Sequence, residues 1–245
     1  MNANVADTSG VNQPNGKSGD SRGVLIWLTK SLAGILMMVA ILFIPAGRLD
    51  WVMGWVYIGV FVLVTAVTAL VADPELLMEE RGRAKEDTES WDKVIFTLYS
   101  LVSPALATPL VAALDVRFEW LPGIPLAVQI GALVVYVLGW AVHLWAMASN
   151  KFFSRTVRIQ EDRGQTVATG GPYRYVRHPG YIGGVLLQVA APITLGSLWA
   201  LIPGGLGALL LIIRTALEDG TLLEKLDGYK EYAQRVRYRL IPGIW

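Results

Sequence analysis

Long apolar segments separated by short polar ones dominate the pattern of this sequence. An apolar run of about 20 residues is long enough to cross the hydrocarbon core of a bilayer as one helix. Runs of this kind lie at residues 24–46, 51–71, 94–114 and 124–148. Two shorter apolar runs follow, at residues 181–195 and 199–213, and they predict a helical hairpin that only just spans. The pattern therefore predicts an all-α fold, a polytopic transmembrane helical bundle with five to six spans.

The polar regions divide the chain into three parts. Residues 1–23 are rich in Asn, Ser, Gly and Asp without an apolar period, which predicts a disordered N-terminal tail. This tail lacks the pattern of a signal peptide, so we expect the first span to be retained. Residues 24–148 hold four transmembrane helices and a charged cytoplasmic loop at 73–93, whose mixed charges favour a solvated surface over a catalytic role. Residues 149–245 are interpreted as the catalytic region.

Composition excludes several classes of protein and site. Hydrophobic residues make up 53% of the chain and charged residues only 17%, which is typical of an integral membrane protein that contacts the lipid bilayer. The absence of cysteine excludes disulfides and thiolate chemistry, and two histidines make a histidine-rich centre unexpected, so we predict no metal site. A net charge of +1 argues against a nucleic-acid partner.

The basic residues predict the orientation of the spans. Lysines and arginines gather before the first span, between the second and third, between the fourth and fifth, and after the last, whereas only Arg48 and Arg117 lie on the other side. By the positive-inside rule both termini are cytoplasmic, and so is the polar chemistry. Trp51, Trp120 and Trp199 fall at the outer turns, where amphipathic rings are favoured.

Residues 170–184 concentrate chemistry in a short stretch. They read Gly-Gly-Pro-Tyr-Arg-Tyr-Val-Arg-His-Pro-Gly-Tyr-Ile-Gly-Gly. Pro172 and Pro179 prevent one uninterrupted helix, and the glycines let backbone approach a ligand closely. Composition alone leaves two readings open, a ligand-binding loop and a basic loop that anchors the protein to lipid headgroups.

The last apolar run leads into a second polar group. Arg214 and Glu218 share a helix face at a spacing of four residues, where a structural salt bridge is the alternative to a functional role. Apolar residues then recur through 222–236 at spacings of four and three, which predicts a C-terminal amphipathic helix. His143 lies inside the fourth span without an acidic neighbour at helical spacing, so we expect it to be packed and hydrogen-bonded.

Two motifs together resemble the isoprenylcysteine carboxyl methyltransferase family. The first is Gly-Pro-Tyr-x-x-x-Arg-His-Pro-x-Tyr-x-Gly at 171–183, and the second is Arg-x-x-x-Glu-Asp-x-x-Leu at 214–222, with Tyr and Ile-Pro residues further on. The likeness is strong from residue 152 onward. The segment 73–81 with Trp91-Asp-Lys is similar to the family's first cytoplasmic loop. Two motifs in this order, flanking an apolar hairpin, are quite specific.

The resemblance implies a membrane methyltransferase that uses S-adenosyl-L-methionine. It assigns Arg214 to the substrate carboxylate, as the catalytic residue. It assigns cofactor contacts to Gln160, Gln165, Thr166, Val167, Ala168, Tyr173, His178, Pro179, Gly180, Tyr181 and Glu218. One position departs from the family, because the second of its paired glutamates is Asp219 here.

The implied reaction is O-methylation of a carboxylate of the isoprenylcysteine type, on a lipophilic small molecule or a prenylated substrate. Such a transfer needs no general acid; it needs nucleophile, methyl group and sulfur in line. Alternatives are a phospholipid N-methyltransferase, an NADPH-dependent sterol-type membrane reductase, and a non-catalytic transporter or scaffold. The short polytopic form is similar to prokaryotic members of the family, which implies a prokaryotic plasma membrane. The sequence leaves the oligomeric state open.

Overall fold

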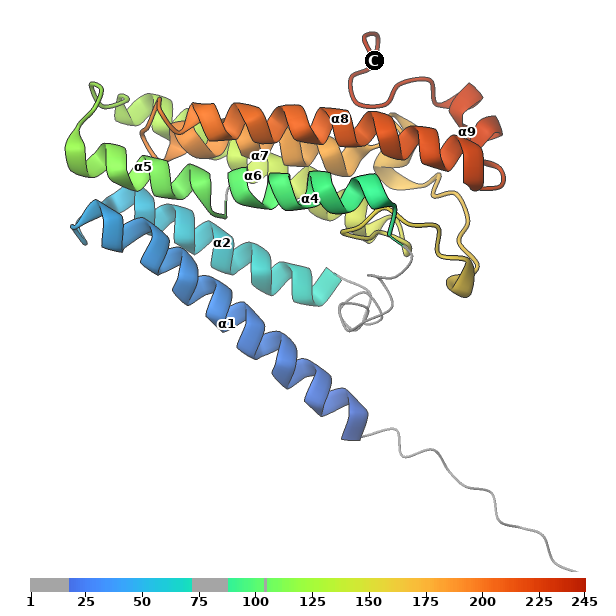
Figure 1. Cartoon of the computed structure of the whole chain (residues 1–245), viewed down its shortest axis with the longest axis horizontal. Helices are drawn as coiled ribbons and strands as arrows, with labels where there is room; N and C mark the ends of the chain where they lie inside the picture. Colours follow the sequence, from blue (N-terminus) through green and yellow to red (C-terminus); the bar gives the residue numbers. More distant parts are fainter. Residues whose placement is uncertain (1–17, 72–87, 104) are drawn as a thin grey trace, which may run out of the picture.

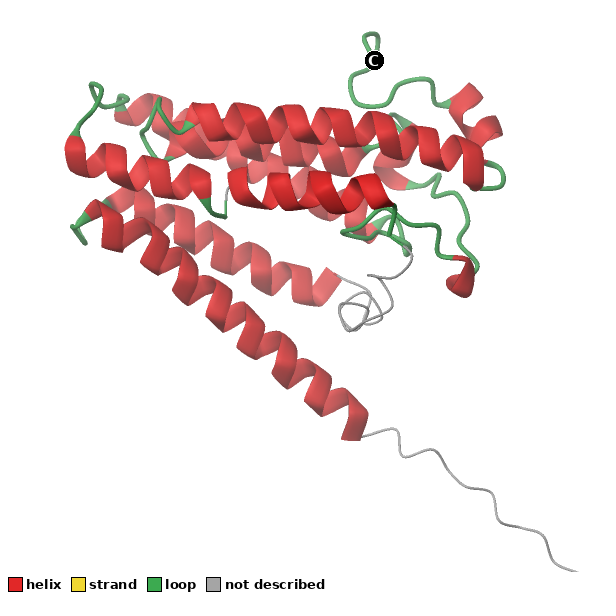
Figure 2. Cartoon of the chain, viewed as in Figure 1, coloured by secondary structure: helices red, strands yellow, loops and turns green. Residues whose placement is uncertain are grey.

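The computed structural model describes residues 18–71, 88–103 and 105–245, with side chains described from residue 28 onward. Everything in these ranges is helix, turn or loop, without a strand (Figure 2). The all-α prediction is therefore confirmed. The predicted tail and most of the charged loop lie outside the described residues. The first helix begins at Ser18, so the last residues of the predicted tail are helical instead.

Eight α-helices and two short 3₁₀ turns follow one another through the described residues. The helices are α1 (Ser18–Ala46), α2 (Val52–Val71), α4 (Ser90–Val102), α5 (Ala107–Phe118), α6 (Leu126–Ala148), α7 (Pro179–Thr194), α8 (Leu201–Lys225) and α9 (Tyr229–Arg235). The 3₁₀ turns, at Glu161–Arg163 and Gly171–Arg174, lie in the segment between α6 and α7.

Five stretches of the described chain are long and apolar enough to cross a membrane, four of them within single helices and the third made of α4 and α5. They are Leu28–Ala46, Val52–Val71, Ser90–Phe118, Leu126–Ala148 and Leu201–Lys225. Helix α7, with 16 residues, is shorter but packs along α8 as the predicted hairpin. The polytopic helical bundle predicted from the sequence is thus confirmed, and the chain is a multi-pass membrane protein.

The third predicted span is interrupted and longer than expected. The sequence predicts a continuous run at 94–114, but α4 ends at Val102 and α5 begins at Ala107. Ser103 is extended, with φ −64° and ψ 165°, as is usual for a residue that precedes a proline. Helix α5 then continues to Phe118, past the predicted end of the run at residue 114.

Close contacts between small residues hold α6, α7 and α8 together. A Cβ at Gly183 of α7 would meet the carbonyl oxygen of Gly139 and the amide of His143 on α6. Likewise a Cβ at Gly207 of α8 would meet the side chain of Gln188 on α7. Small residues allow helices in a membrane to approach closely, so these positions pack α6 tightly against α7 and α8, the two helices that carry the motifs.

The C-terminal segment differs from the single amphipathic helix predicted for residues 222–236. Helix α8 runs on to Lys225, and the chain turns at Gly228, with φ +78°, before the short α9. The apolar side chains of Leu226, Tyr229 and Tyr232 form a buried cluster against residues between α6 and α7. This face is covered by protein beside the cavity, so the apolar face is as predicted, but one continuous helix over residues 222–236 is not formed.

The two ends of the bundle differ in what they carry. Figure 1 shows the hairpin turns α1–α2, α5–α6 and α7–α8 at one end. The segment between α6 and α7, the start of α4, α9 and the C-terminus lie at the other. The motifs of the sequence are therefore gathered at a single end.

Candidate functional site

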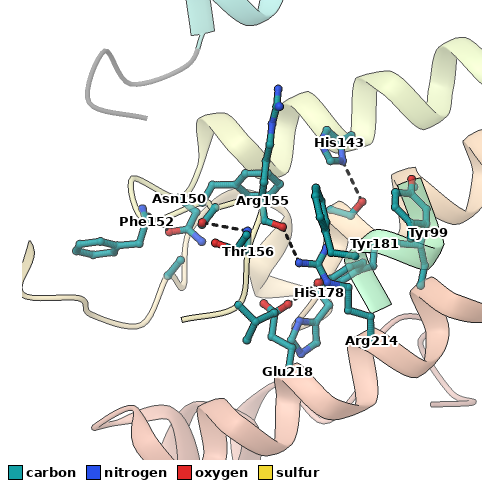
Figure 3. Close-up of a pocket in the computed structure, with 18 of the residues that line it drawn as sticks. Tyr99, His143, Asn150, Phe152, Arg155, Thr156, His178, Tyr181, Arg214 and Glu218 are labelled. Atoms are coloured by element: carbon teal, nitrogen blue, oxygen red, sulfur yellow. Dashed lines mark hydrogen bonds between the residues drawn. The ribbon is translucent and has the colours of Figure 1, made fainter. Parts of the chain in front are cut away.

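A cavity of about 530 Å³ lies where α6 ends and α7 begins (Figure 3). Its volume is within the range of about 300–1,000 Å³ that is usual for small-molecule sites. One end, here called the polar end, is lined by residues of the segment 150–168, by the 171–183 motif and by Glu218. The other, the apolar end, reaches core side chains that include Tyr57 and Tyr136.

The structure brings almost all of the predicted site residues to this cavity. Those that line it are Gln160, Gln165, Thr166, Val167, Ala168, Tyr173, His178, Gly180, Tyr181, Arg214 and Glu218. Pro179 is the exception: it is buried as the first residue of α7, where a proline fits because its missing amide would have no helical partner.

The glutamines between α6 and α7 fold their own segment. The Gln160 side chain is buried, its Nε2 donates to the carbonyl of Phe152 over 2.8 Å, and its Oε1 accepts from Arg163 over 2.8 Å. Gln165 Oε1 accepts from the Gln160 amide over 2.7 Å. These bonds fix the wall of the polar end, so both side chains shape the cavity through the backbone that they hold.

Glu218 and Asp219 are neighbours on α8, but their side chains lie in different surroundings. Successive residues of an α-helix point about 100° apart. Glu218 lines the cavity and accepts a hydrogen bond from the hydroxyl of Tyr181. Asp219 has no exposed surface and does not line the cavity. One carboxylate is therefore available to a ligand, and the other is committed to the protein.

Asp219 is the buried centre of a group that we call the Asp219 cluster, made of Asp219, Arg177, His178, Tyr229 and Arg239. Arg177 donates to both carboxylate oxygens, over 2.8 and 2.9 Å. Arg239 donates to Oδ2 over 2.8 Å, and Tyr229 and His178 reach Oδ1 over 2.9 and 3.0 Å. His178 is thus directed at Asp219 by Nε2. The cluster joins the start of α7 to the C-terminal segment.

Electrostatics keeps the tyrosine of this cluster protonated. Burial raises the pKa of the Tyr229 hydroxyl, and the charge of Asp219, to which it donates, raises this pKa further. A hydroxyl held in its neutral form remains a donor to the carboxylate. Tyr232 secures the same region, because its hydroxyl donates to the carbonyl of Tyr173 over 2.7 Å.

Arg214 is bound to a partner that sequence reasoning did not assign. Its Nε and Nη2 donate to the carboxylate of Asp92 over 2.7 and 3.1 Å, and Nη2 also donates to the carbonyl of Arg155 over 2.6 Å. The guanidinium lies 5.5 Å from the ring centre of Phe96 and 5.7 Å from that of Tyr181. Figure 3 shows the Arg214 guanidinium at the backbone carbonyl of Arg155, with the Arg155 side chain extending away. The alternative of a structural pair between Arg214 and Glu218 is wrong: the partner of Arg214 is Asp92.

Asp92 corrects the interpretation of its segment as a solvated surface. It lies in the first turn of α4 with no exposed surface, and besides Arg214 it accepts the amide of Val157 over 2.8 Å. Glu89, just before α4, pairs with Lys225 at the end of α8 over 2.6 Å. The start of α4 is therefore attached both to the segment between α6 and α7 and to α8. The burial of Asp92 could not be predicted from its segment, which is rich in charges of both signs. Only a tertiary contact distinguishes one buried carboxylate in such a segment.

His143 is packed and hydrogen-bonded, as predicted. Its Nδ1 lies 3.1 Å from the carbonyl oxygen of Gly180, and its ring meets Trp140 and Phe153 edge to face. The structure adds that His143 lines the cavity.

A comparison with known families decides which proteins this arrangement is similar to. Residues 132–224 match the isoprenylcysteine carboxyl methyltransferase (ICMT) family. The resemblance drawn from the motifs is thereby confirmed for this region, which runs from α6 to the end of α8. A search of curated proteins finds no match.

The ICMT match covers the α6–α8 core but not all residues that build the site. Asp92, Tyr229 and Arg239 lie outside residues 132–224, and each makes a hydrogen bond to a residue inside them. Sequence reasoning missed Arg177 and Asp219 as partners although both stand within the motifs. The signal that could have found them is the presence of an arginine in one motif and a carboxylate in the other. Each of these charges needs an opposite charge when it is buried.

Proposed function

We propose that this chain catalyses methyl transfer from S-adenosylmethionine to a lipophilic acceptor inside the membrane. The observation that carries the proposal is the continuity of the cavity from its polar end to its apolar end. A methyl donor with an adenosine and an amino acid group suits the first, and an apolar acceptor arriving from the bilayer suits the second. The ICMT match supports a methyltransferase.

The side chains at the polar end fit such a cofactor. The Glu218 carboxylate accepts hydrogen bonds from ribose hydroxyls or an ammonium group, and the Tyr181 ring beside it offers a π face to a cation. The buried Thr156 Oγ1 lines the cavity without a partner among the described residues, and a bound ligand would satisfy it. The cofactor supplies an activated methyl group on a cationic sulfur.

What the protein contributes to the reaction is alignment. The close packing of α6, α7 and α8 holds Tyr181 and Glu218 in fixed positions relative to the apolar end. Holding reactants in line can be worth about 7–11 kcal/mol in the best cases. Apolar walls also keep water from the transferring group.

Calorimetric titration of the purified protein with S-adenosylhomocysteine tests the cofactor assignment. We expect micromolar affinity, on the order of 8 kcal/mol. Glu218→Ala should weaken binding strongly, whereas Glu224→Ala, on the exposed face of the same helix, should leave it unchanged. NADPH should not bind. Binding of NADPH in place of S-adenosylhomocysteine would favour a reductase, and equal affinity in both variants would remove Glu218 from the site.

The carboxylate acceptor implied by the resemblance stays a prediction that depends on Arg214. Arg214→Lys keeps the charge but loses the planar geometry that holds a carboxylate in two bonds. If Arg214 binds the acceptor, this variant should retain S-adenosylhomocysteine affinity and lose at least tenfold in turnover of a prenylcysteine-type acid, which is about 1.4 kcal/mol in the barrier. A second candidate is methyl transfer to an amine. The Arg214–Asp92 pair favours it, because Nε and Nη2 of this arginine already hold the Asp92 carboxylate and are not available to hold that of an acceptor.

We infer that the polar end faces the cytoplasm of a prokaryotic plasma membrane, with both termini on that side. The basic residues at this end of the bundle support the orientation. Reporter tags at the two ends of the chain provide the test. Tags that report opposite sides of the membrane would contradict it.

A further inference from the structure

An apolar loop adjoins the Asp219 cluster. Residues 240–245, here called the 240–245 loop, follow Arg239 directly and read Leu-Ile-Pro-Gly-Ile-Trp. Ile241 is 53% exposed and Ile244 is 77% exposed, whereas Leu240 is buried. Single exposed apolar residues are normal on a protein surface, but two isoleucines in one short loop with a tryptophan indicate a contact surface.

Two backbone hydrogen bonds place this loop beside the start of α7. The amide of Arg177 donates to the carbonyl of Tyr238 over 2.9 Å, and the amide of His178 donates to the carbonyl of Arg239 over 3.0 Å. Helix α7 begins at the next residue, Pro179. Figure 1 shows that the chain turns back after α9 and reaches its C-terminus to one side of α8, short of the end of that helix. The loop therefore lies on the flank of the helical bundle, next to the residues where α7 enters it.

The 240–245 loop pairs most of its own backbone donors. The amides of Leu240 and Ile241 donate to the carbonyl of Trp245 over 3.0 and 3.1 Å. Those of Ile244 and Trp245 donate to the carbonyl of Ile241, both over 3.1 Å. Pro242 has no amide hydrogen to pair. Unpaired backbone groups are what an apolar phase penalises most, so a loop bonded in this way can enter such a phase at low cost.

The surroundings of the loop are basic and aromatic. The segments 170–184 and 232–245, which are joined by the backbone bonds described above, contain no acidic residue. Their exposed side chains include Arg174, Tyr175, Arg235, Arg237 and Tyr238. Arginines, aromatic rings and isoleucines together are typical of the interfacial region of a bilayer, where the rings lie at headgroup level and the cations meet anionic lipids.

We propose that the 240–245 loop docks on the bilayer at the end of the bundle that carries the motifs. Ile241 and Ile244 insert among the lipid chains, and the neighbouring arginines contact anionic headgroups. The guanidinium of Arg239 lies 5.1 Å from the ring centre of Trp245, and its Nε donates to Asp219 over 2.8 Å. Lipid that holds the loop therefore also holds one arginine of the Asp219 cluster.

Spin labels test where the loop lies. Because the chain has no cysteine, Ile244→Cys can carry a single nitroxide label. The labelled protein, in nanodiscs that contain phosphatidylglycerol, is exposed to oxygen, which partitions into lipid, and to a nickel complex that stays in water. We expect oxygen to be the more accessible probe at position 244, as at Leu138→Cys on an exposed position of α6. Glu231→Cys, on an exposed position of α9, should show the reverse.

Each other result would contradict the proposal. Ile241→Cys repeats the measurement at a second exposed position of the loop. Greater access of nickel at both positions would place the loop in water and overturn the proposal. Low access of both probes would mean that a second copy of the chain or another protein covers the loop, which would also overturn it. Phosphatidylcholine in place of phosphatidylglycerol should reduce the excess of oxygen at 244, and an unchanged excess would overturn the assignment of anionic headgroups.

A charge in the loop tests its link to the Asp219 cluster. Ile244→Glu should lower the Tm measured in nanodiscs, because a carboxylate is disfavoured among lipid chains and the loop would leave the bilayer. Glu231→Gln, which changes an exposed charge on α9, should leave Tm unchanged. An equal Tm for Ile244→Glu and the wild type would overturn the link. None of these measurements involves S-adenosylmethionine, so their outcome is independent of the proposed methyl transfer.

Discussion

Asp92 and Asp219 are both fully buried carboxylates held by an arginine in two bonds, yet they lie in different surroundings. Asp92 has one arginine and one backbone amide as partners, and its arginine lines the cavity. Asp219 has two arginines, a tyrosine and a histidine, and does not line the cavity itself. Equal burial does not make the two residues equal in role.

The elements that each carboxylate joins explain the difference. Asp219 ties α8 to the start of α7 and to the C-terminal segment, where Arg177 also donates to the carbonyls of Val236 and Arg237 over 2.9 and 2.7 Å. Asp92 ties α4 to α8 beside the cavity. We infer that Asp219 mainly maintains the fold at the polar end, and that Asp92 mainly determines how Arg214 is presented there. Removing each in turn should separate stability from turnover.

The largest effect is expected for Asp219→Ala. It leaves the side chains of Arg177 and Arg239 without their carboxylate, and breaking a buried ion pair from one side costs about 3–5 kcal/mol of stability. Thermal unfolding in detergent should show a marked fall in Tm. Asp50→Ala breaks an Arg–Asp pair of similar length that is exposed, 72% for the aspartate side chain, and should leave Tm unchanged. Similar shifts in both variants would show that burial does not distinguish these pairs.

Asp92→Asn should affect turnover more than stability. The amide oxygen can still accept the Val157 N–H, but Arg214 loses its charged partner and its fixed orientation. We expect turnover to fall at least tenfold, which corresponds to about 1.4 kcal/mol in the barrier. S-adenosylhomocysteine affinity and Tm should change less than in Asp219→Ala. A Tm as low as that of Asp219→Ala with unchanged turnover in the surviving protein would give Asp92 the role assigned here to Asp219.

Tyr229→Phe removes one neutral donor from the Asp219 cluster and should cost about 1 kcal/mol, the usual net value of a hydrogen bond. The pH dependence gives a second readout. Because the pKa of Tyr229 is raised in the folded protein, its contribution is complete below pH about 10, where an unfolded tyrosine ionises, and is lost as the pH rises further. Tm measured from pH 8 to 11 should fall more steeply above pH 10 in the wild type than in the variant. Parallel curves would contradict the raised pKa.

The smallest effect is expected for Arg239→Gln. The Arg239 side chain is 31% exposed, so solvent screens its pair with Asp219, and Arg177 still holds the carboxylate. We expect a Tm slightly below that of the wild type and well above that of Asp219→Ala. A loss as large as that of Asp219→Ala would mean that the C-terminal contact dominates the cluster.

The helical bundle was readable from the sequence because it depends on local quantities. Run length and apolar composition located the spans. The main error of this prediction was that it missed the break between α4 and α5. The C-terminal prediction of one continuous helix was wrong for a related reason. The spacing of Leu226, Tyr229 and Tyr232 correctly marked an apolar face, but a turn at Gly228 divides the helix and protein covers that face.

The sequence by itself predicted the likeness of residues 132–224 to the ICMT family and most of the residues that line the cavity, because both follow from motifs whose members stand close together in the chain. Only the tertiary structure decided how these residues are paired. Asp92 and Arg214 are 122 positions apart, and Arg177 and Asp219 are 42 apart. Local patterning carries no information about which buried cation meets which buried anion. Burial makes an unpaired charge costly, so packing of α4, α7 and α8 selects the partners that the sequence leaves open.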